Sequence, residues 1–159
     1  VLERALRAAE FYKYDSFFRI CGDRPFFDHS YYDQMIEEHL KAMCDLTTNI
    51  FPRTVPQGYT GEVIKTLALK KILKMTNKPL DLEHVTRFFY KNASLFSIKN
   101  ISFSLPKHIV DLKLVIDDME DYKRAEWILK TINDREIKEN SQSIFQLAME
   151  WENNQKIKS

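Results

Sequence analysis

Glycine and cysteine are scarce in this chain of 159 residues. The three glycines are Gly22, Gly58 and Gly61, so neither G-x-G-x-x-G nor G-x-x-x-x-G-K-S/T occurs and no glycine-rich phosphate loop is recognisable. The signatures G-x-S-x-G and H-E-x-x-H of α/β-hydrolases and zinc proteases are also missing. Cys21 and Cys44 lack the C-x-x-C spacing of zinc clusters and make no disulfide framework, so we expect two free thiols.

Long runs of residues of one kind are missing as well. The 24 Lys and Arg residues alternate with 23 Asp and Glu residues, leaving a net charge of +1 and no basic tail for a polyanion such as nucleic acid. No apolar stretch approaches the roughly 20 residues that cross a bilayer, and the first residues do not resemble a signal peptide. We therefore expect a cytoplasmic globular protein with no nucleic-acid partner and no membrane partner.

Strand-like and helix-like patterns alternate along the chain, which is typical of a layered α/β fold. The residue types predict strands at residues 16–20, 45–51, 95–103 and 112–116, and a brief strand at 62–64. Apolar spacing predicts helices at residues 1–14, 30–43, 66–75, 81–92 and 141–158, and a long helix that starts at 117–121. Ser30 is the predicted N-cap of the second helix. We expect a mixed central sheet of the four longer strands, with helices on its faces.

Acidic residues follow two of the predicted strands. Asp23 lies in the turn after residues 16–20, and Asp117 follows residues 112–116. Ligands bind outside the carboxyl ends of the strands in open α/β sheets, where two carboxylates could share Mg²⁺ with substrate phosphates. The structural alternative is that Asp23 is a turn residue and that Asp117 or Asp118 caps the following helix. Spacing by itself does not separate these interpretations.

Two further side chains could recognise a ligand. Arg53 lies in the loop at residues 52–61, which contains two of the three glycines and two of the five prolines. Its guanidinium could bind a carboxylate or a phosphate bidentately. His84, in the predicted helix at 81–92, could donate a hydrogen bond to a sugar or transfer a proton. The alternatives are an exposed loop arginine and a structural histidine.

Four segments carry motifs in a recognisable order. Residues 19–28, R-I-C-G-D-R-P-F-F-D, are similar to R-I-T-G-D-C-P-L-I-D, and residues 49–63 contain N-x-x-P-R-T-x-P-x-G-x-x-x-E-V. Residues 83–86 are E-H-V-T, and residues 116–122, I-D-D-M-E-D-Y, are similar to V-D-T-P-E-D-F. Over about residues 1–132 the chain thus resembles the cytidylyltransferases of the spore-coat polysaccharide biosynthesis type, relatives of the CMP-Kdo and CMP-sialic acid synthetases.

This resemblance implies a Rossmann-like, GT-A-like nucleotidyltransferase. Such an enzyme would activate an acidic sugar with CTP and Mg²⁺, giving a CMP-sugar and pyrophosphate for surface polysaccharide biosynthesis. By their positions in the motifs, Asp23 and Asp117 would be the catalytic metal ligands. Arg53, Glu62 and His84 would lie on the sugar side or build the contact of a homodimer.

The chain departs from the family pattern in two respects. Nothing in it resembles the family's opening strand and G-S-x-R-L-P-G-K loop, and Val1-Leu2-Glu3-Arg4 is similar to a D-V-L-x-R helix inside the family's domain. We therefore expect an N-terminally truncated domain that is inactive alone, with residues 1–135 as its C-terminal portion and 136–159 as a C-terminal amphipathic helix. Within the motifs the usual Thr, Cys, Thr and Pro are replaced by Cys21, Arg24, Asp118 and Met119.

These departures leave two other functions open. One is a non-catalytic remnant of the fold that serves as a binding or dimerisation module. The other is a GT-A-type glycosyltransferase, in which Asp118-Met119-Glu120 would act as a metal-binding D-x-D.

Overall fold

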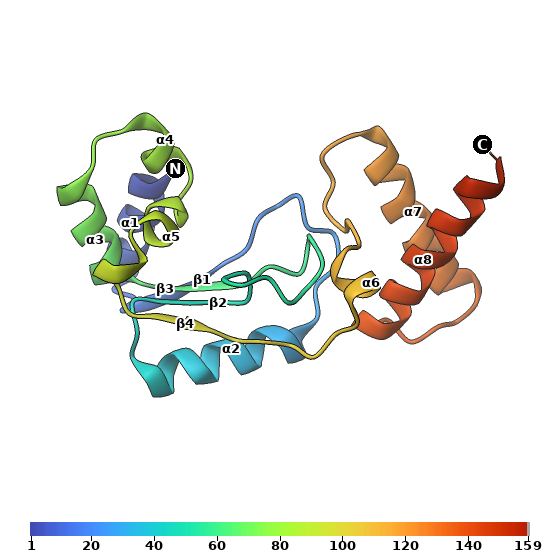
Figure 1. Cartoon of the computed structure of the whole chain (residues 1–159), viewed down its shortest axis with the longest axis horizontal. Coiled ribbons are helices and arrows are strands. Elements are labelled where there is room, and N and C mark those ends of the chain that lie inside the picture. Colours follow the sequence, from blue (N-terminus) through green and yellow to red (C-terminus); the bar gives the residue numbers. More distant parts are fainter. Residues whose placement is uncertain (159) are drawn as a thin grey trace. The chain divides into compact units, whose positions relative to one another are not determined.

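The computed structural model describes residues 1–158 and contains a four-stranded mixed sheet with flanking helices (Figure 1). The strand order is β1-β3-β2-β4, with β1 at Ser16–Arg19, β2 at Leu46–Thr48, β3 at Glu62–Lys65 and β4 at Ile98–Asn100. β3 is antiparallel to β1 and β2, and β4 is parallel to β2. β1, β2 and β4 therefore end at one edge of the sheet, where β3 begins. The expected α/β class with a mixed sheet is confirmed.

The helical elements are α1 (Leu2–Phe11), α2 (His29–Ala42), α3 (Thr66–Met75), α4 (Pro79–Glu83), α5 (Arg87–Lys91), the 3₁₀ helix η1 (Ala93–Leu95), α6 (Lys107–Val110), α7 (Met119–Asp134) and α8 (Ser141–Lys158). The predicted bounds of the helices at 66–75 and 141–158 coincide with α3 and α8. No helix within residues 1–158 is long and apolar enough to span a bilayer. Cys21 and Cys44 are free thiols, as expected.

The chain divides into two compact units. Residues 1–20, 31–52 and 61–102 form the first, and residues 21–30, 53–60 and the segment from 103 onward form the second. The first unit contains the sheet with α1, α3, α4, α5 and nearly all of α2, and the second contains α6, α7 and α8. The expected division after residue 135 stays a prediction.

The core of the first unit is built on one face of the sheet. Alternation along the strands places one apolar row on this face, in register across the strands: Phe17, Ile64, Leu46 and Ile98. This row packs with buried residues of α1, α3 and α5, among them Leu6, Leu69 and Phe89. On the other face Phe18 contacts Tyr32 of α2, with ring centroids 4.8 Å apart. In Figure 1, α2 accordingly lies on one side of the sheet and α1, α3 and α5 on the other.

The single helix predicted at residues 81–92 is wrong. Two short helices, α4 and α5, are separated by a break at His84, whose φ and ψ of −96° and 95° are extended. Val85, which follows the break, is 1% exposed and lies in the same core as Phe88 and Phe89. The β-branched side chains of Val85 and Thr86 favour helix weakly, so this short helix pattern is interrupted while Val85 still reaches the core.

The strand predicted at residues 112–116 is also wrong, because this segment joins no strand of the sheet. It forms one parallel bridge, between Lys113 and Gln57. The amide of Gln57 donates to the carbonyl of Leu112 at 3.2 Å, and the amide of Leu114 donates to the carbonyl of Gln57 at 2.7 Å. Leu112 and Leu114 are both buried, so the alternating apolar pattern reports burial and not a ladder partner. The strands predicted at 45–51 and 95–103 are confirmed only for residues 46–48 and 98–100.

The carboxylate of Asp28 accepts hydrogen bonds from the N-terminal turns of two helices. Its Oδ1 accepts hydrogen bonds from the amide and the hydroxyl of Ser30 in α2, at 2.9 and 2.6 Å. Its Oδ2 accepts from the amide of Ser141 in α8 at 3.0 Å and from the hydroxyl of the same residue. Burial by itself raises the pKa of Asp28, but these hydrogen bonds outweigh it and lower the pKa. Asp28, and not the expected Ser30, therefore caps α2.

Candidate functional site

Polar side chains make up the last row of the sheet at the edge where β1, β2 and β4 end. Arg19 pairs with Glu62, Glu62 with Thr48, and Thr48 with Asn100. Alternation puts this row on the face that carries the apolar core row, beneath α1, α3 and α5. Folds of this class bind ligands at the carboxyl ends of their strands. The row is therefore a candidate ligand-binding edge.

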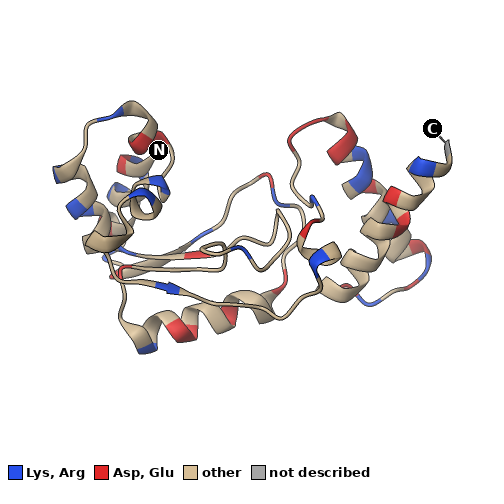
Figure 2. Cartoon of the chain, in the orientation of Figure 1, with Lys and Arg blue, Asp and Glu red and all other residues tan. Residues whose placement is uncertain are grey.

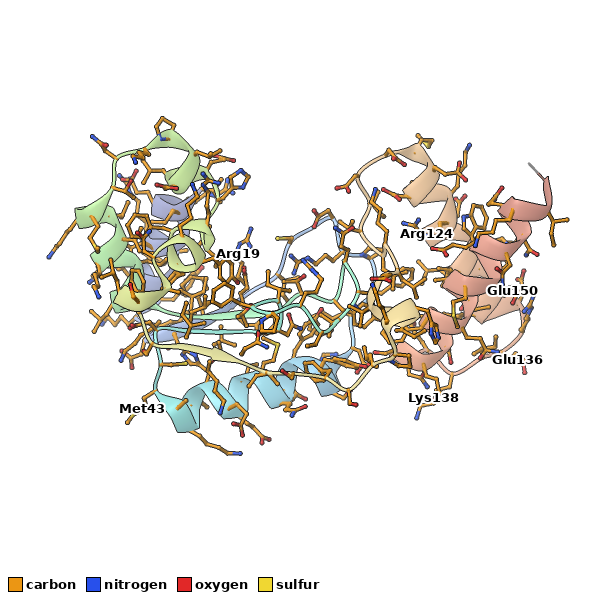
Figure 3. All side chains as sticks on the ribbon, viewed as in Figure 1. Arg19, Met43, Arg124, Glu136, Lys138 and Glu150 are labelled. Atoms are coloured by element: carbon orange, nitrogen blue, oxygen red, sulfur yellow. The ribbon has the colours of Figure 1, made fainter. Side chains whose placement is uncertain are left out.

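Glu62 lies at the centre of this row and is 2% exposed. Its Oε2 accepts a hydrogen bond from Arg19 at 2.7 Å, and its Oε1 accepts one from the hydroxyl of Tyr90 at 2.9 Å. The Thr48 hydroxyl lies 3.0 Å from the same tyrosine oxygen. Burial, followed by the charge of Glu62, raises the pKa of Tyr90, so its phenol stays protonated and donates. The network fixes Arg19, which projects from the sheet on the side of α5 (Figure 3).

The loop between β2 and β3 is held by contacts of its own motif residues. Asn49 is fully buried, and its Oδ1 accepts a hydrogen bond from the amide of Gly61 at 3.0 Å. Gly58 has a φ of +103°, and a Cβ at this position would lie 2.3 Å from the carbonyl oxygen of Leu114. Only glycine fits such a close approach in this conformation. Asn49 and Gly58 of the loop motif therefore have structural roles.

Arg53 lines a cavity of about 500 Å³ in the second unit. Its guanidinium donates to the hydroxyl of Thr60 at 3.2 Å. Phe103, Lys107 and Asp111 are among the other lining residues. The lining contains two basic side chains, Arg53 and Lys107, and one acidic side chain, Asp111, which lies 2.7 Å from Lys107. The arrangement suits a ligand with one anionic group.

The two candidate metal ligands lie on segments that are hydrogen-bonded to each other. The amide of Ile116 donates to the carbonyl of Asp23 at 2.9 Å, next to Asp117 in the chain. Both aspartates are exposed. Asp23 lies 4.0 Å from Nε of Arg24, and Asp117 lies 3.1 Å from Nζ of Lys113.

Two exposed carboxylates on adjoining segments are a donor set that fits Mg²⁺ shared with a phosphate, since this ion keeps several waters. Across residues 1–158 no group of three or more His, Cys, Asp or Glu residues could hold a metal by itself. Phosphate oxygens and water would therefore complete the coordination of an ion at Asp23 and Asp117.

Two aspartates at the start of α7 have structural roles. Asp118 is the N-cap of α7, and its Oδ1 accepts the amides of Glu120 and Asp121, each at 2.9 Å. The cap interpretation is confirmed for this residue. Asp121 is 4% exposed and its Oδ2 accepts from Lys113 at 2.5 Å and from the amide of Asp117 at 3.0 Å. Burial by itself raises the pKa of Asp121, but these hydrogen bonds, with one from Arg124, bring the pKa to about 2.

His84 is the C-cap of α4 and is exposed. In the described part of the chain its ring makes no hydrogen bond or ion pair. Arg19 thus contacts Glu62, and the segment of Asp23 is hydrogen-bonded to the segment that precedes Asp117. The ring of His84 contacts neither pair through a hydrogen bond or an ion pair within the described residues.

A sequence profile of the cytidylyltransferase family matches residues 1–156. The chain belongs to the cytidylyltransferase family. The fold is similar to that of a cytidylyltransferase from Leptospira borgpetersenii serovar Hardjo-bovis, with a TM-score of 0.71 and 24% identity over 88% of this chain and 65% of that one.

The chain is 30% identical, over 125 residues, to an uncharacterized protein of Methanocaldococcus jannaschii, an alignment that covers 77% of this chain and 49% of that protein. The chain therefore spans about half the length of the curated relative that it matches.

Sequence reasoning missed three residues of these networks as candidates, namely Arg19, Tyr90 and Asp121. Arg19 and Asp121 stand inside motifs shared with the family, which was an available signal. Tyr90 lies outside the four motifs, and nothing local distinguishes it from the phenylalanines before it.

Proposed function

We propose that the protein transfers CMP from CTP to an acidic sugar and releases pyrophosphate, to supply a CMP-sugar for surface polysaccharide biosynthesis. The supporting observation is the family match over residues 1–156, which includes both acidic segments. In this reaction a hydroxyl oxygen of the sugar attacks the α-phosphorus of CTP, and the bond from that phosphorus to the pyrophosphate oxygen breaks. Residues of this chain would bind the phosphates of CTP through a metal and would position the acceptor sugar.

Asp23 and Asp117 are proposed as the metal-binding carboxylates. When bound, Mg²⁺ would neutralise charge on the phosphates of CTP. Asp121 accepts a hydrogen bond from the amide of Asp117 at 3.0 Å and so fixes the backbone at this proposed metal ligand. Lys113 lies 2.5 Å from Asp121, and it would therefore keep a carboxylate partner if Asp117 held a metal.

Arg53, Glu62 and His84 are proposed for the sugar side. Arg53 would bind the sugar carboxylate, because it lines this cavity and a guanidinium matches a carboxylate bidentately. Glu62 would act through Arg19, since both of its oxygens already accept hydrogen bonds and the residue is 2% exposed. The exposed ring of His84 is available to a sugar hydroxyl.

The test is pyrophosphate release from CTP with Mg²⁺ and a panel of sugar acids. It is run on this chain and on any longer form of the protein. In a form that releases pyrophosphate, Asp23→Asn and Asp117→Asn should each lower turnover at least about 100-fold, because a lost metal ligand removes several kcal/mol of transition-state stabilisation. Asp33→Asn, at an exposed position of α2, is the matched control and should retain turnover.

Three outcomes decide between the interpretations. Turnover of both variants at the parental rate would show that the metal assignment is wrong and that Asp23 is only a turn residue. Turnover with CTP but with no sugar acid in the panel would limit the proposal to nucleotidyl transfer. Absence of pyrophosphate release from every form would favour the non-catalytic binding module.

A further inference from the structure

Positive charge is concentrated in the helical corner of the first unit. Residues 65–92, which include α3, α4 and α5, contain seven Lys and Arg residues and two Asp and Glu residues, a net charge of +5 in a chain whose total is +1. Figure 2 shows blue positions along α3 and around α4 and α5. Although the two signs alternate along most of the sequence, this stretch has an excess of positive charge, which the folded first unit gathers in one corner. A region with excess positive charge attracts anions.

A cavity of about 630 Å³ lies in this corner, between the end of α3 and the helices α4 and α5. Its charged lining residues are Lys78, Arg87, Lys91 and one carboxylate, Asp81. The lining thus has an excess of two positive charges. None of the candidate residues for CMP transfer lines it.

The arginine of this cavity is held by a buried carboxylate. Asp81 is 6% exposed, and its Oδ1 accepts a hydrogen bond from Nε of Arg87 at 3.1 Å. Its Oδ2 accepts one from the hydroxyl of Thr76 at 3.2 Å. Because the contact uses Nε, it fixes the guanidinium without using the two terminal nitrogens, which make no hydrogen bond to any residue from 1 to 158. Terminal nitrogens in a fixed plane are the donors that bind phosphate bidentately.

The two lysines of the cavity add charge that nothing in the described chain neutralises. The ammonium groups of Lys78 and Lys91 make no ion pair or hydrogen bond within residues 1–158. Other lysines of the first unit do have acidic partners, such as Lys70, which lies 2.8 Å from Glu10. Cations around one cavity repel each other, and a bound anion would relieve this repulsion.

We propose that this cavity is a phosphate-binding site, separate from the site of CMP transfer. A phosphate group carries close to two negative charges at neutral pH and so matches the excess charge of the lining. Arg87 would bind two of its oxygens, and Lys78 and Lys91 would approach from the sides as point charges. Two sources share this chemistry, a soluble phosphorylated compound and the headgroup of a phospholipid, whose chains could contact the exposed Leu80 beside the site.

The proposal is tested by titrating the chain with inorganic phosphate and with pyrophosphate, followed by backbone amide NMR. A second arm measures cosedimentation with vesicles of phosphatidylcholine with and without phosphatidic acid. We expect saturable shift changes centred on residues 76–92 in the first arm, or binding that requires phosphatidic acid in the second. The first result identifies a soluble ligand and the second a lipid headgroup, and either supports the site.

Variants separate a built site from general electrostatic attraction. Lys78→Gln and Arg87→Gln should each weaken binding at least about tenfold, which corresponds to one lost charged contact. Lys74→Gln is the matched control, because it removes the same charge from α3 at an exposed position that does not line the cavity. Equal weakening by Lys74→Gln and Lys78→Gln would overturn the proposal, and so would the absence of binding in both arms. The proposal can fail while CMP transfer stands, because these measurements use no CTP turnover.

Discussion

Replacement of Arg19 by methionine is expected to destabilise the first unit by about 2–3 kcal/mol. The substitution removes the 2.7 Å contact to Glu62, a residue that is 2% exposed. Removing one partner of a buried ion pair typically costs about 3–5 kcal/mol, because the other charge stays buried without compensation. The Arg19 side chain is 28% exposed, so water can approach the vacated position and the cost falls below that range.

A second substitution tests whether the unpaired buried carboxylate of Glu62 causes this loss of stability. In the Arg19→Met background, Glu62→Gln should recover at least about 1 kcal/mol, because a neutral amide costs less to bury than an unpaired carboxylate. In the parent, Glu62→Gln should destabilise, because it removes the charge that pairs with Arg19. The same substitution thus has opposite signs in the two backgrounds, and a double-mutant cycle measures the coupling.

Urea unfolding followed by far-UV circular dichroism gives the free energies for the cycle. The control is Arg7→Met, which removes a helical ion pair whose side chains are 76% and 61% exposed and which should cost less than about 0.5 kcal/mol. Our reasoning about the edge of the sheet is refuted if Arg19→Met costs no more than this control. Additive effects of the two substitutions would refute it equally.

Two further predictions concern the second unit. The pKa of Asp121, lowered to about 2, means that this residue contributes stability above the ordinary Asp pKa of about 3.9 and that the contribution disappears as the pH falls toward 2. Asp121→Asn should remove this part of the acid dependence, on the order of 1–2 kcal/mol, in urea midpoints measured from pH 5 to 2. Gly58→Ala should cost about 2–4 kcal/mol, since the added Cβ would lie 2.3 Å from the carbonyl oxygen of Leu114 at a positive φ. Gly22→Ala, whose Cβ would have no heavy atom within 4 Å, should change the thermal midpoint little, and equal effects of the two alanines would contradict the steric explanation.

Local patterns predicted the elements whose signals are continuous along the chain. α3 and α8 have the predicted bounds, and each carries buried apolar residues at helical spacing: Leu69 and Ile72 in α3, and Ile144 and Ala148 in the first half of α8. The strand predicted at residues 112–116 was wrong because the alternating burial of Leu112 and Leu114 resembles that of a strand. The single bridge of this segment to Gln57 is not visible in the sequence. The single helix predicted at residues 81–92 was wrong because burial of Val85 in the core interrupts the helix between α4 and α5.

The α/β class, the membership of the cytidylyltransferase family and the acidic residues of the two motif turns were predictable from the sequence, since residue types and their order encode them directly. It did not determine what those residues contact. Arg19 is 43 positions from Glu62, and Tyr90 is 28 positions from it. Their meeting depends on the antiparallel register of β1 with β3 and on how α5 packs against the sheet. Register and packing arise from the whole core, so the burial of Glu62 beside Arg19 and the contact of Asp121 with the amide of Asp117 became visible only in the folded chain.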